Sequence, residues 1–355
     1  MTRTAINLAL QGGGAHGAFT WGTLDRLLEE EDIEIEGITA TSAGAMNAAA
    51  LKHGWISGGN AGARESLDSF WLSLAGLDGV LSDAIIEWLR CVSPNPTVIA
   101  RVIEANPAVL AGEVVTRMLS PYQLNPLNFH PLRSTVEALL DYDKVCASTG
   151  PKLFITATHV RTGKPRVFSG DDITADAILA SACLPTIYQA IEIEDPRTGK
   201  MEAYWDGGYM GNPALFPLFY STESPDILIV HINPLEREDV PRTAQDILNR
   251  INEISFNASL LRELRGIDFV NRLIENGVIA PEAMKQNFIH SVRDDAFMSQ
   301  LGIATKMTLN RALLLQLKDA GRAAMDGFLA RNLRHIGRRS SVDLRGMFTS
   351  EGSTV

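Results

Sequence analysis

The clearest indication of the fold class is the sequence AINLALQGGGAHG at residues 5–17. Residues 5–10 are mostly apolar and predict a short buried strand, which ends at the glycines that follow. Residues 15–30 predict a helix, because Phe19, Leu24 and Leu27 recur near helical spacing while charged residues lie mostly on the other side. A strand, a glycine loop and a helix in this order indicate the start of an α/β sheet.

The same alternation continues along the chain. We expect a strand at 35–41, helices at 43–52 and 61–75 around a glycine-rich loop at 57–60, a strand at 152–160, a return strand at 166–169, a helix at 175–182, and strands at 188–193, 203–205 and 227–233. From 236 to about 334 the pattern is helical. The sequence therefore predicts an α/β fold with a mostly parallel central sheet covered by helices.

Composition excludes several classes of protein. The chain has 355 residues, 45% of them hydrophobic, so it can bury a core and is not disordered as a whole. Its formal net charge of −10 disfavours general nucleic-acid binding. Three scattered cysteines, Cys91, Cys146 and Cys183, form neither a disulfide framework nor a zinc pattern. No signal peptide or membrane-spanning stretch stands out, so we expect a cytoplasmic protein, either free or peripheral at a membrane.

The glycine loop fits two chemistries. Gly12, Gly14 and Gly17 satisfy the G-x-G-x-x-G fingerprint of dinucleotide-binding folds. That fingerprint also needs an acidic residue at the end of the next strand, where this chain has Thr41-Ser42. The alternative is a nest of backbone N–H groups at a helix N-terminus, which stabilises a developing oxyanion. Residues 12–15 are therefore a candidate oxyanion hole.

The second turn resembles a nucleophile elbow. Residues 40–44 read ATSAG, close to G-x-S-x-G, and small residues at Ala40 and Gly44 suit a serine on a sharp turn between a strand and a helix. The alternative is that Ser42 only caps the helix. Because adjacent turns of a parallel sheet share one edge, we expect Ser42 to lie beside the glycine loop.

A serine nucleophile needs a base, and Asp206 is the strongest candidate. It stands at the end of an expected strand, before Gly207 and Gly208, which permit a close approach to another backbone. The alternative is an ordinary Asp-Gly turn. Of the seven histidines none lies in a catalytic-loop signal, and His16, beside the glycine loop, is the most interesting; His16 or His231 would be the next base to test.

Taken in order, residues 12–17, 41–44 and 206–208 resemble the motifs of patatin-like phospholipases, and the resemblance extends over about residues 5–235. It implies a three-layer fold and a Ser–Asp dyad. It assigns Ser42 as nucleophile, Asp206 as base, an oxyanion hole at Gly12, Gly13, Gly14 and Ala15, and supporting roles for His16, Gly17, Ala40, Gly44, Gly207 and Gly208. His16 stands where the family usually has Lys or Arg. The site thereby lacks a fixed positive charge, and activity should depend on pH if the imidazole titrates near its ordinary ~6.5.

We expect three parts in the chain: a catalytic domain at 5–235, a helical extension at 236–335 packed on it, and a flexible tail or small basic contact at 336–355. Within the first, residues 77–132 predict short apolar helices that either pack over the sheet or form a lid. The expected function is a serine acyl-ester hydrolase of the phospholipase A, lysophospholipase or lipase type, acting on lipid or other acyl esters without cofactor or metal. The alternatives are a lipid-binding scaffold and a nucleotide-binding oxidoreductase. The sequence favours neither a monomer nor a homodimer.

Overall fold

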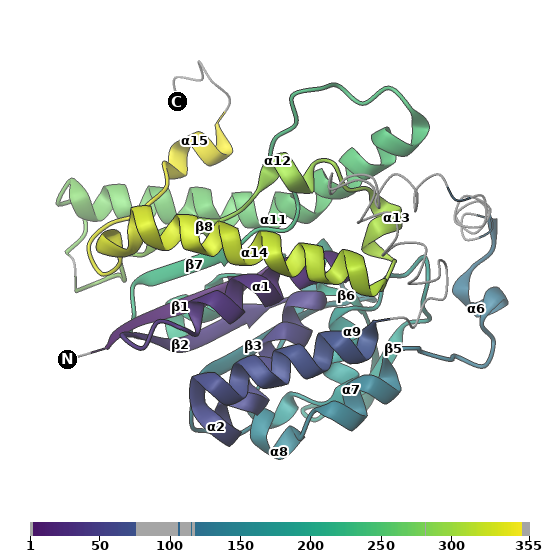
Figure 1. The fold of residues 1–355 in the computed structure, drawn as a ribbon. Helices are drawn as coiled ribbons and strands as arrows, with labels where there is room; N and C mark the ends of the chain where they lie inside the picture. The colour runs from purple at the N-terminus through teal and green to yellow at the C-terminus, as the bar shows by residue number, and fades with distance from the viewer. Residues whose placement is uncertain (1–2, 76–105, 107–114, 116–117, 281, 350–355) are drawn as a thin grey trace.

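A computed structural model describes residues 3–75, 106, 115, 118–280 and 282–349 (Figure 1). Cys91 and most of the expected 77–132 insertion lie outside these residues. The described chain forms an eight-stranded sheet with strands β1 (Thr4–Leu10), β2 (Ile33–Ala40), β3 (Lys152–His159), β4 (Lys164–Ser169), β5 (Ile191–Asp195), β6 (Lys200–Asp206), β7 (Asp226–Val230) and β8 (Phe288–Val292).

The sheet is mostly parallel, as predicted. Its order is β5-β6-β3-β2-β1-β7-β8, with β4 paired to β3 at the side of this path. β3, β2, β1, β7 and β8 run parallel, while β4 and β6 pair antiparallel with β3, and β5 pairs antiparallel with β6. Because β1 pairs in parallel with both β2 and β7, the carboxyl ends of these three strands, at Leu10, Ala40 and Val230, lie at one edge of the sheet.

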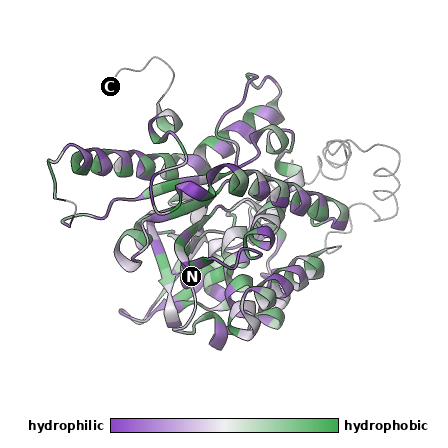
Figure 2. Cartoon of the chain, turned by 60° about the vertical axis from the view of Figure 1, so that its left-hand side comes forward, coloured by the Kyte–Doolittle hydropathy of each residue, from purple (hydrophilic) through white to green (hydrophobic). Residues whose placement is uncertain are grey.

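Helices cover both faces of the sheet. Successive side chains of a strand point to opposite faces, so each central strand contributes apolar side chains to two cores. Leu228 and Val230 of β7 join the core under α1 (Gly17–Leu27), α2 (Ala43–Leu74), α9 (Ala175–Ser181) and α14 (Arg311–Asn332). Ile227 and Ile229 join the core under α10 (Phe216–Ser221) and α11 (Ala244–Glu275). The surface helices alternate hydrophilic and hydrophobic residues along their length (Figure 2). The three-layer α/β fold expected from the sequence is therefore confirmed.

Short helices complete the described chain. They are α6 (Pro121–Leu124), α7 (Arg133–Leu139), α8 (Tyr142–Val145), α12 (Asp295–Met298), α13 (Ile303–Lys306), α15 (Leu344–Phe348) and the 3₁₀ turns η1 (Gly14–His16), η2 (Gly170–Asp172), η3 (Gly207–Tyr209) and η4 (Leu333–His335). Among the helices of the described residues, none has the length and apolar character needed to cross a membrane.

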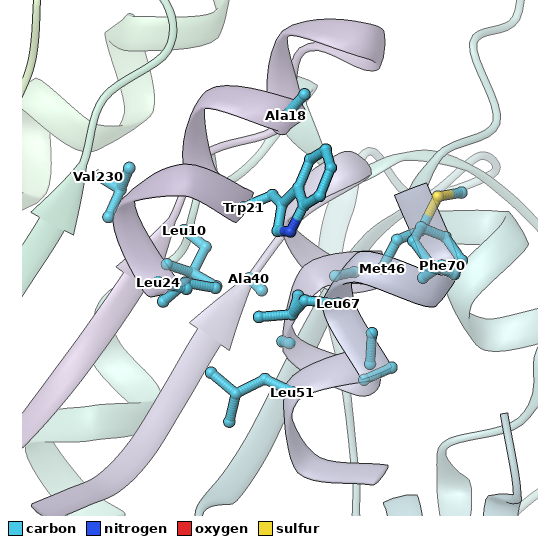
Figure 3. Close-up of a cluster of buried hydrophobic side chains, with 14 of the residues drawn as sticks. Leu10, Ala18, Trp21, Leu24, Ala40, Met46, Leu51, Leu67, Phe70 and Val230 are labelled. Carbon is cyan, nitrogen blue, oxygen red and sulfur yellow. The ribbon is translucent and has the colours of Figure 1, made fainter. Parts of the chain in front are cut away.

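The C-terminal extension is packed directly on the first helix. A side chain at Gly22 of α1 would bring its Cβ to 1.8 Å from the Lys318 carbonyl oxygen, and one at Gly321 of α14 to 2.0 Å from the Phe19 carbonyl oxygen. On the neighbouring side of α1, Trp21 lies over the core formed with Leu10 and Ala40 (Figure 3). Two glycines thus let α14 touch the helix that follows the glycine loop.

Three expectations are corrected by the structure. Residues 236–334 are not wholly helical, because β8 pairs in parallel with β7; its short apolar run between helices gives no clear strand signal. The loop expected at 57–60 is only a kink at Gly58 and Gly59 within α2. The described part of the expected tail, residues 336–349, is tied to the sheet, because the Gly337 N–H donates to Asp226 and the Ser341 N–H donates to the Ile289 carbonyl.

Candidate active site

Ser42 lies on a strained turn between β2 and α2. Its φ of 54° and ψ of −122° place a non-glycine residue in the left-handed half of the Ramachandran plot. Gly44 permits this turn, because a Cβ there would lie 2.3 Å from the Leu10 carbonyl oxygen. The Ser42 N–H donates to Ser181 Oγ at 2.8 Å, and that hydroxyl donates to the Thr156 carbonyl at 2.6 Å. The surroundings hold the backbone in this unusual conformation, as expected of a functional site.

The glycine loop lies against this turn, as predicted from the shared sheet edge. A Cβ at Gly12 would lie 2.6 Å from Ser42 Cβ, and a Cβ at Gly17 would lie 2.6 Å from Ala43 Cβ. Ala40, at the end of β2, is fully buried and pairs with Leu10 of β1. Because Gly12 and Gly17 have no side chains, the glycine loop can pack directly against the turn that carries Ser42.

The loop offers backbone donors at Gly13 and Gly14. None of the hydrogen bonds between described residues uses the N–H of either glycine, and Gly14 begins the 3₁₀ turn η1, whose first N–H groups have no partner inside the helix. The Gly12 N–H, by contrast, donates to Asn212 Oδ1 at 2.6 Å. Gly12 therefore shapes the loop, and its amide is occupied.

Asp206 ends β6 with its carboxyl group buried. The Gly208 N–H donates to Asp206 Oδ1 at 2.7 Å, whereas no hydrogen bond joins the side chains of Ser42 and Asp206 in this structure. The Ser42 hydroxyl is near enough to lower the pKa of the carboxyl. Such contacts are often long in unliganded enzymes. Burial raises the pKa of Asp206 to about 7, and the interactions with Gly208 and Ser42 offset only part of this effect. A carboxyl group with this pKa can accept and return a proton near neutral pH.

Gly207 and Gly208 allow the carboxyl to reach this position. A Cβ at Gly207 would lie 2.0 Å from the Thr156 carbonyl oxygen of β3, and one at Gly208 would lie 2.3 Å from the Phe256 ring. The two glycines singled out in the sequence therefore permit the close approach that was expected of them.

His16 does not behave as expected from its sequence position. It is buried, and its Nε2 lies 2.8 Å from the Thr305 hydroxyl of α13. Burial, together with the Lys306 ammonium group, lowers the pKa of His16 well below its ordinary value. The imidazole is therefore neutral near pH 7, and the titration near 6.5 that the sequence suggested for it is wrong.

A cavity of about 180 Å³ opens beside Ser42. Its lining is almost entirely apolar and comes from the glycine loop, from α2, from the segment around Leu132 and from the C-terminal extension. The lining residues are Gly14, Ala15, Ser42, Ala43, Met46, Trp71, Leu74, Pro131, Leu132, Ala182, Leu184, Tyr188, Lys306, Met307 and Leu309. The cavity suits an apolar chain whose reacting end lies at Ser42.

Sequence reasoning missed several residues of this site. Asn212 and Ser181 hold the backbone of Gly12 and Ser42, and Lys306 brings a positive charge to the cavity. A single short polar side chain does not reveal in the sequence which distant backbone group it will bind, and residue 306 lies 264 positions beyond Ser42. Among the described residues no group of three His, Cys, Asp or Glu side chains could hold a metal ion.

Comparisons with known proteins bear on this arrangement. The sequence profile of the patatin-like phospholipases matches residues 8–219. The crystal structure of VipD from Legionella pneumophila is similar over 89% of this chain and 67% of that chain, with a TM-score of 0.35 and 14% identity, values too low to bear on function. Among curated proteins none matches. Since the matched profile spans more than half of the chain, the protein belongs to the patatin-like phospholipase family and, in general terms, to the lipid acyl hydrolases.

Proposed function

We propose that the protein hydrolyses lipid acyl esters through a Ser42–Asp206 dyad and an acyl-serine intermediate. The observation that carries the proposal is a strained serine that lines an apolar cavity together with Gly14 of the glycine loop, and that influences a buried carboxyl group with a pKa of about 7. Each feature alone has a structural explanation, but together they supply a nucleophile, a base and an oxyanion site.

The reaction follows from the roles of these groups. Ser42 Oγ attacks the ester carbonyl while the Asp206 carboxylate accepts its proton. The carbonyl oxygen becomes negative and receives hydrogen bonds from the Gly13 and Gly14 N–H groups. Asp206 then returns the proton to the departing alkoxide, which leaves an acyl-serine. A water molecule, deprotonated by Asp206, releases the fatty acid and restores Ser42.

An exposed apolar segment beside the cavity indicates how lipid reaches it. Residues 118–132 contain no Asp, Glu, Lys or Arg. In this segment the exposed fraction is 79% for Met118, 92% for Leu127 and 72% for Phe129, while Pro131 and Leu132 line the cavity itself. Apolar side chains so exposed are typical of an interaction surface. We infer that this segment contacts the lipid surface from which the substrate is drawn.

The test is covalent labelling with a fluorophosphonate probe, read by intact mass. Wild-type protein should gain one adduct, Ser42→Ala should gain none, and Ser57→Ala, which changes an exposed serine, should label like wild type. Asp206→Asn should slow labelling and abolish ester hydrolysis. Absence of labelling in folded wild-type protein, with and without lipid micelles, would contradict the proposal and favour a lipid-binding scaffold.

A further inference from the structure

Lys306 differs from every other residue around the cavity. It ends α13, in the extension that lies outside residues 8–219, and among the described residues that line the cavity it is the one that carries a charge. The other lining residues are apolar or glycine, except Ser42 and Tyr188, which carry neutral hydroxyl groups. A cation in such a wall is costly unless a partner compensates it.

No protein carboxylate supplies that compensation. Within the described chain, no Asp or Glu oxygen lies within 4.0 Å of the Lys306 ammonium, whose hydrogen bond goes to the neutral Asn233 Oδ1 at 2.8 Å. Glu253 is the acidic residue that influences it most, but Glu253 forms ion pairs with Arg237 at 2.5 Å and Arg250 at 3.1 Å. An ammonium group has three donors, and only one of them has a partner among the described residues, which leaves two that a ligand could use.

The position of this cation is fixed relative to the reacting centre. Asn233, which accepts from Lys306, donates through Nδ2 to the Gly12 carbonyl at 2.8 Å. The Lys306 carbonyl oxygen lies so close to Gly14 that a Cβ there would approach it to 2.2 Å. The backbone of Lys306 therefore packs against Gly14, while its side chain is connected to Gly12 through Asn233.

We propose that Lys306 binds an anionic group of the amphiphile that occupies the cavity, and so selects anionic over neutral acyl esters; this rests on the proposed function. The shared chemistry is a phosphate or carboxylate oxygen that accepts charge-assisted hydrogen bonds from the ammonium. Burial lowers the pKa of Lys306 to about 8, in keeping with a charge that lacks an anionic partner in the protein alone.

The test measures binding of three twelve-carbon probes that contain no ester: dodecyl phosphate, dodecanoate and 1-O-dodecylglycerol. Titration calorimetry below the micelle concentration would compare full-length wild type with Lys306→Met and Lys306→Gln, and with Lys306→Arg as the charge-retaining control. Either neutral variant should bind dodecyl phosphate about 10-fold or more weakly, since hydrogen bonds to charged groups are strong. The affinity for the neutral ether 1-O-dodecylglycerol should change by less than about 2-fold. Lys306→Arg should keep most of the affinity for dodecyl phosphate.

The arms separate the sources of the anion. If the neutral variants lose affinity for dodecyl phosphate alone, Lys306 binds a head group. If they lose affinity equally for dodecanoate, Lys306 also binds the released fatty acid. The proposal would be overturned if the neutral variants bound all three probes equally more weakly, or if they kept the wild-type affinity for both anions. Because the probes have no scissile bond, this outcome is independent of Ser42 chemistry. Fluorophosphonate labelling of the same variants reports separately on the dyad and on folding of the site.

Discussion

Replacing Asp206 with asparagine should inactivate the enzyme and yet stabilise it, and the gain should grow with pH. In the folded protein the pKa of Asp206 is about 7, against an ordinary value of 3.8. Between these two values the folded state binds a proton that the unfolded state has lost. Stability therefore falls as pH rises from about 4 to 7 and then levels off.

The size of the effect follows from the difference between the two pKa values. At ~1.36 kcal/mol per pH unit, a difference of about 3 units amounts to an unfavourable contribution on the order of 4 kcal/mol above pH 7. Asparagine keeps an acceptor for the Gly208 N–H, which lies 2.7 Å from Oδ1, but carries no charge to desolvate. Asp206→Asn should thus match the wild-type free energy of unfolding at pH 4 and exceed it by up to about 4 kcal/mol at pH 8.

Equilibrium unfolding in urea at pH 4, 5, 6, 7 and 8 would measure this difference, with Asp319→Asn as a matched control. Asp319 is exposed on α14, so its replacement should change stability by less than about 0.5 kcal/mol at any pH. In parallel, wild-type kcat/KM should rise about tenfold per pH unit below 7 and become flat above it, because the carboxylate form of Asp206 is the proposed base. A stability difference that does not grow between pH 4 and 7 would refute the assignment of Asp206 as a buried, protonated carboxyl.

Two further predictions concern the loop and the lipid surface. Gly14→Ala should lower kcat by a factor of about 10²–10³, because its Cβ would meet a carbonyl oxygen of α13 at 2.2 Å and displace the proposed oxyanion donors. Gly163→Ala has a similar positive φ but open space around it, so in ester-hydrolysis assays it should retain activity, and equal losses would disprove a specific loop effect. The double variant Leu127→Asp, Phe129→Asp should bind sedimenting lipid vesicles at least about 10-fold more weakly while its hydrolysis of a soluble monomeric ester is unchanged. Val240→Asp, at another exposed apolar residue, is the control, and equal vesicle binding by all three proteins would remove segment 118–132 from lipid contact.

Much of the fold could be predicted from local patterns. Residues 5–10 and 35–41 each combine a short apolar run with a turn signal, and the structure places strands at Thr4–Leu10 and Ile33–Ala40. β8 was missed because five residues between helices carry too little periodicity to distinguish a strand. Its position is decided by pairing with β7, which is a long-range contact.

Local sequence patterns are enough to identify the motif-bearing residues of the candidate site, because turns that need glycine or a small residue leave a local signature at Gly14, Gly44 and Gly207. The protonation states of the site residues, in contrast, depend on how the whole chain packs around them. Burial raises the pKa of Asp206 and lowers that of His16, and desolvation depends on every element packed around a group. The tertiary structure also brought Lys306 from the C-terminal extension to the glycine loop, a contact between residues almost 300 positions apart that no local pattern encodes.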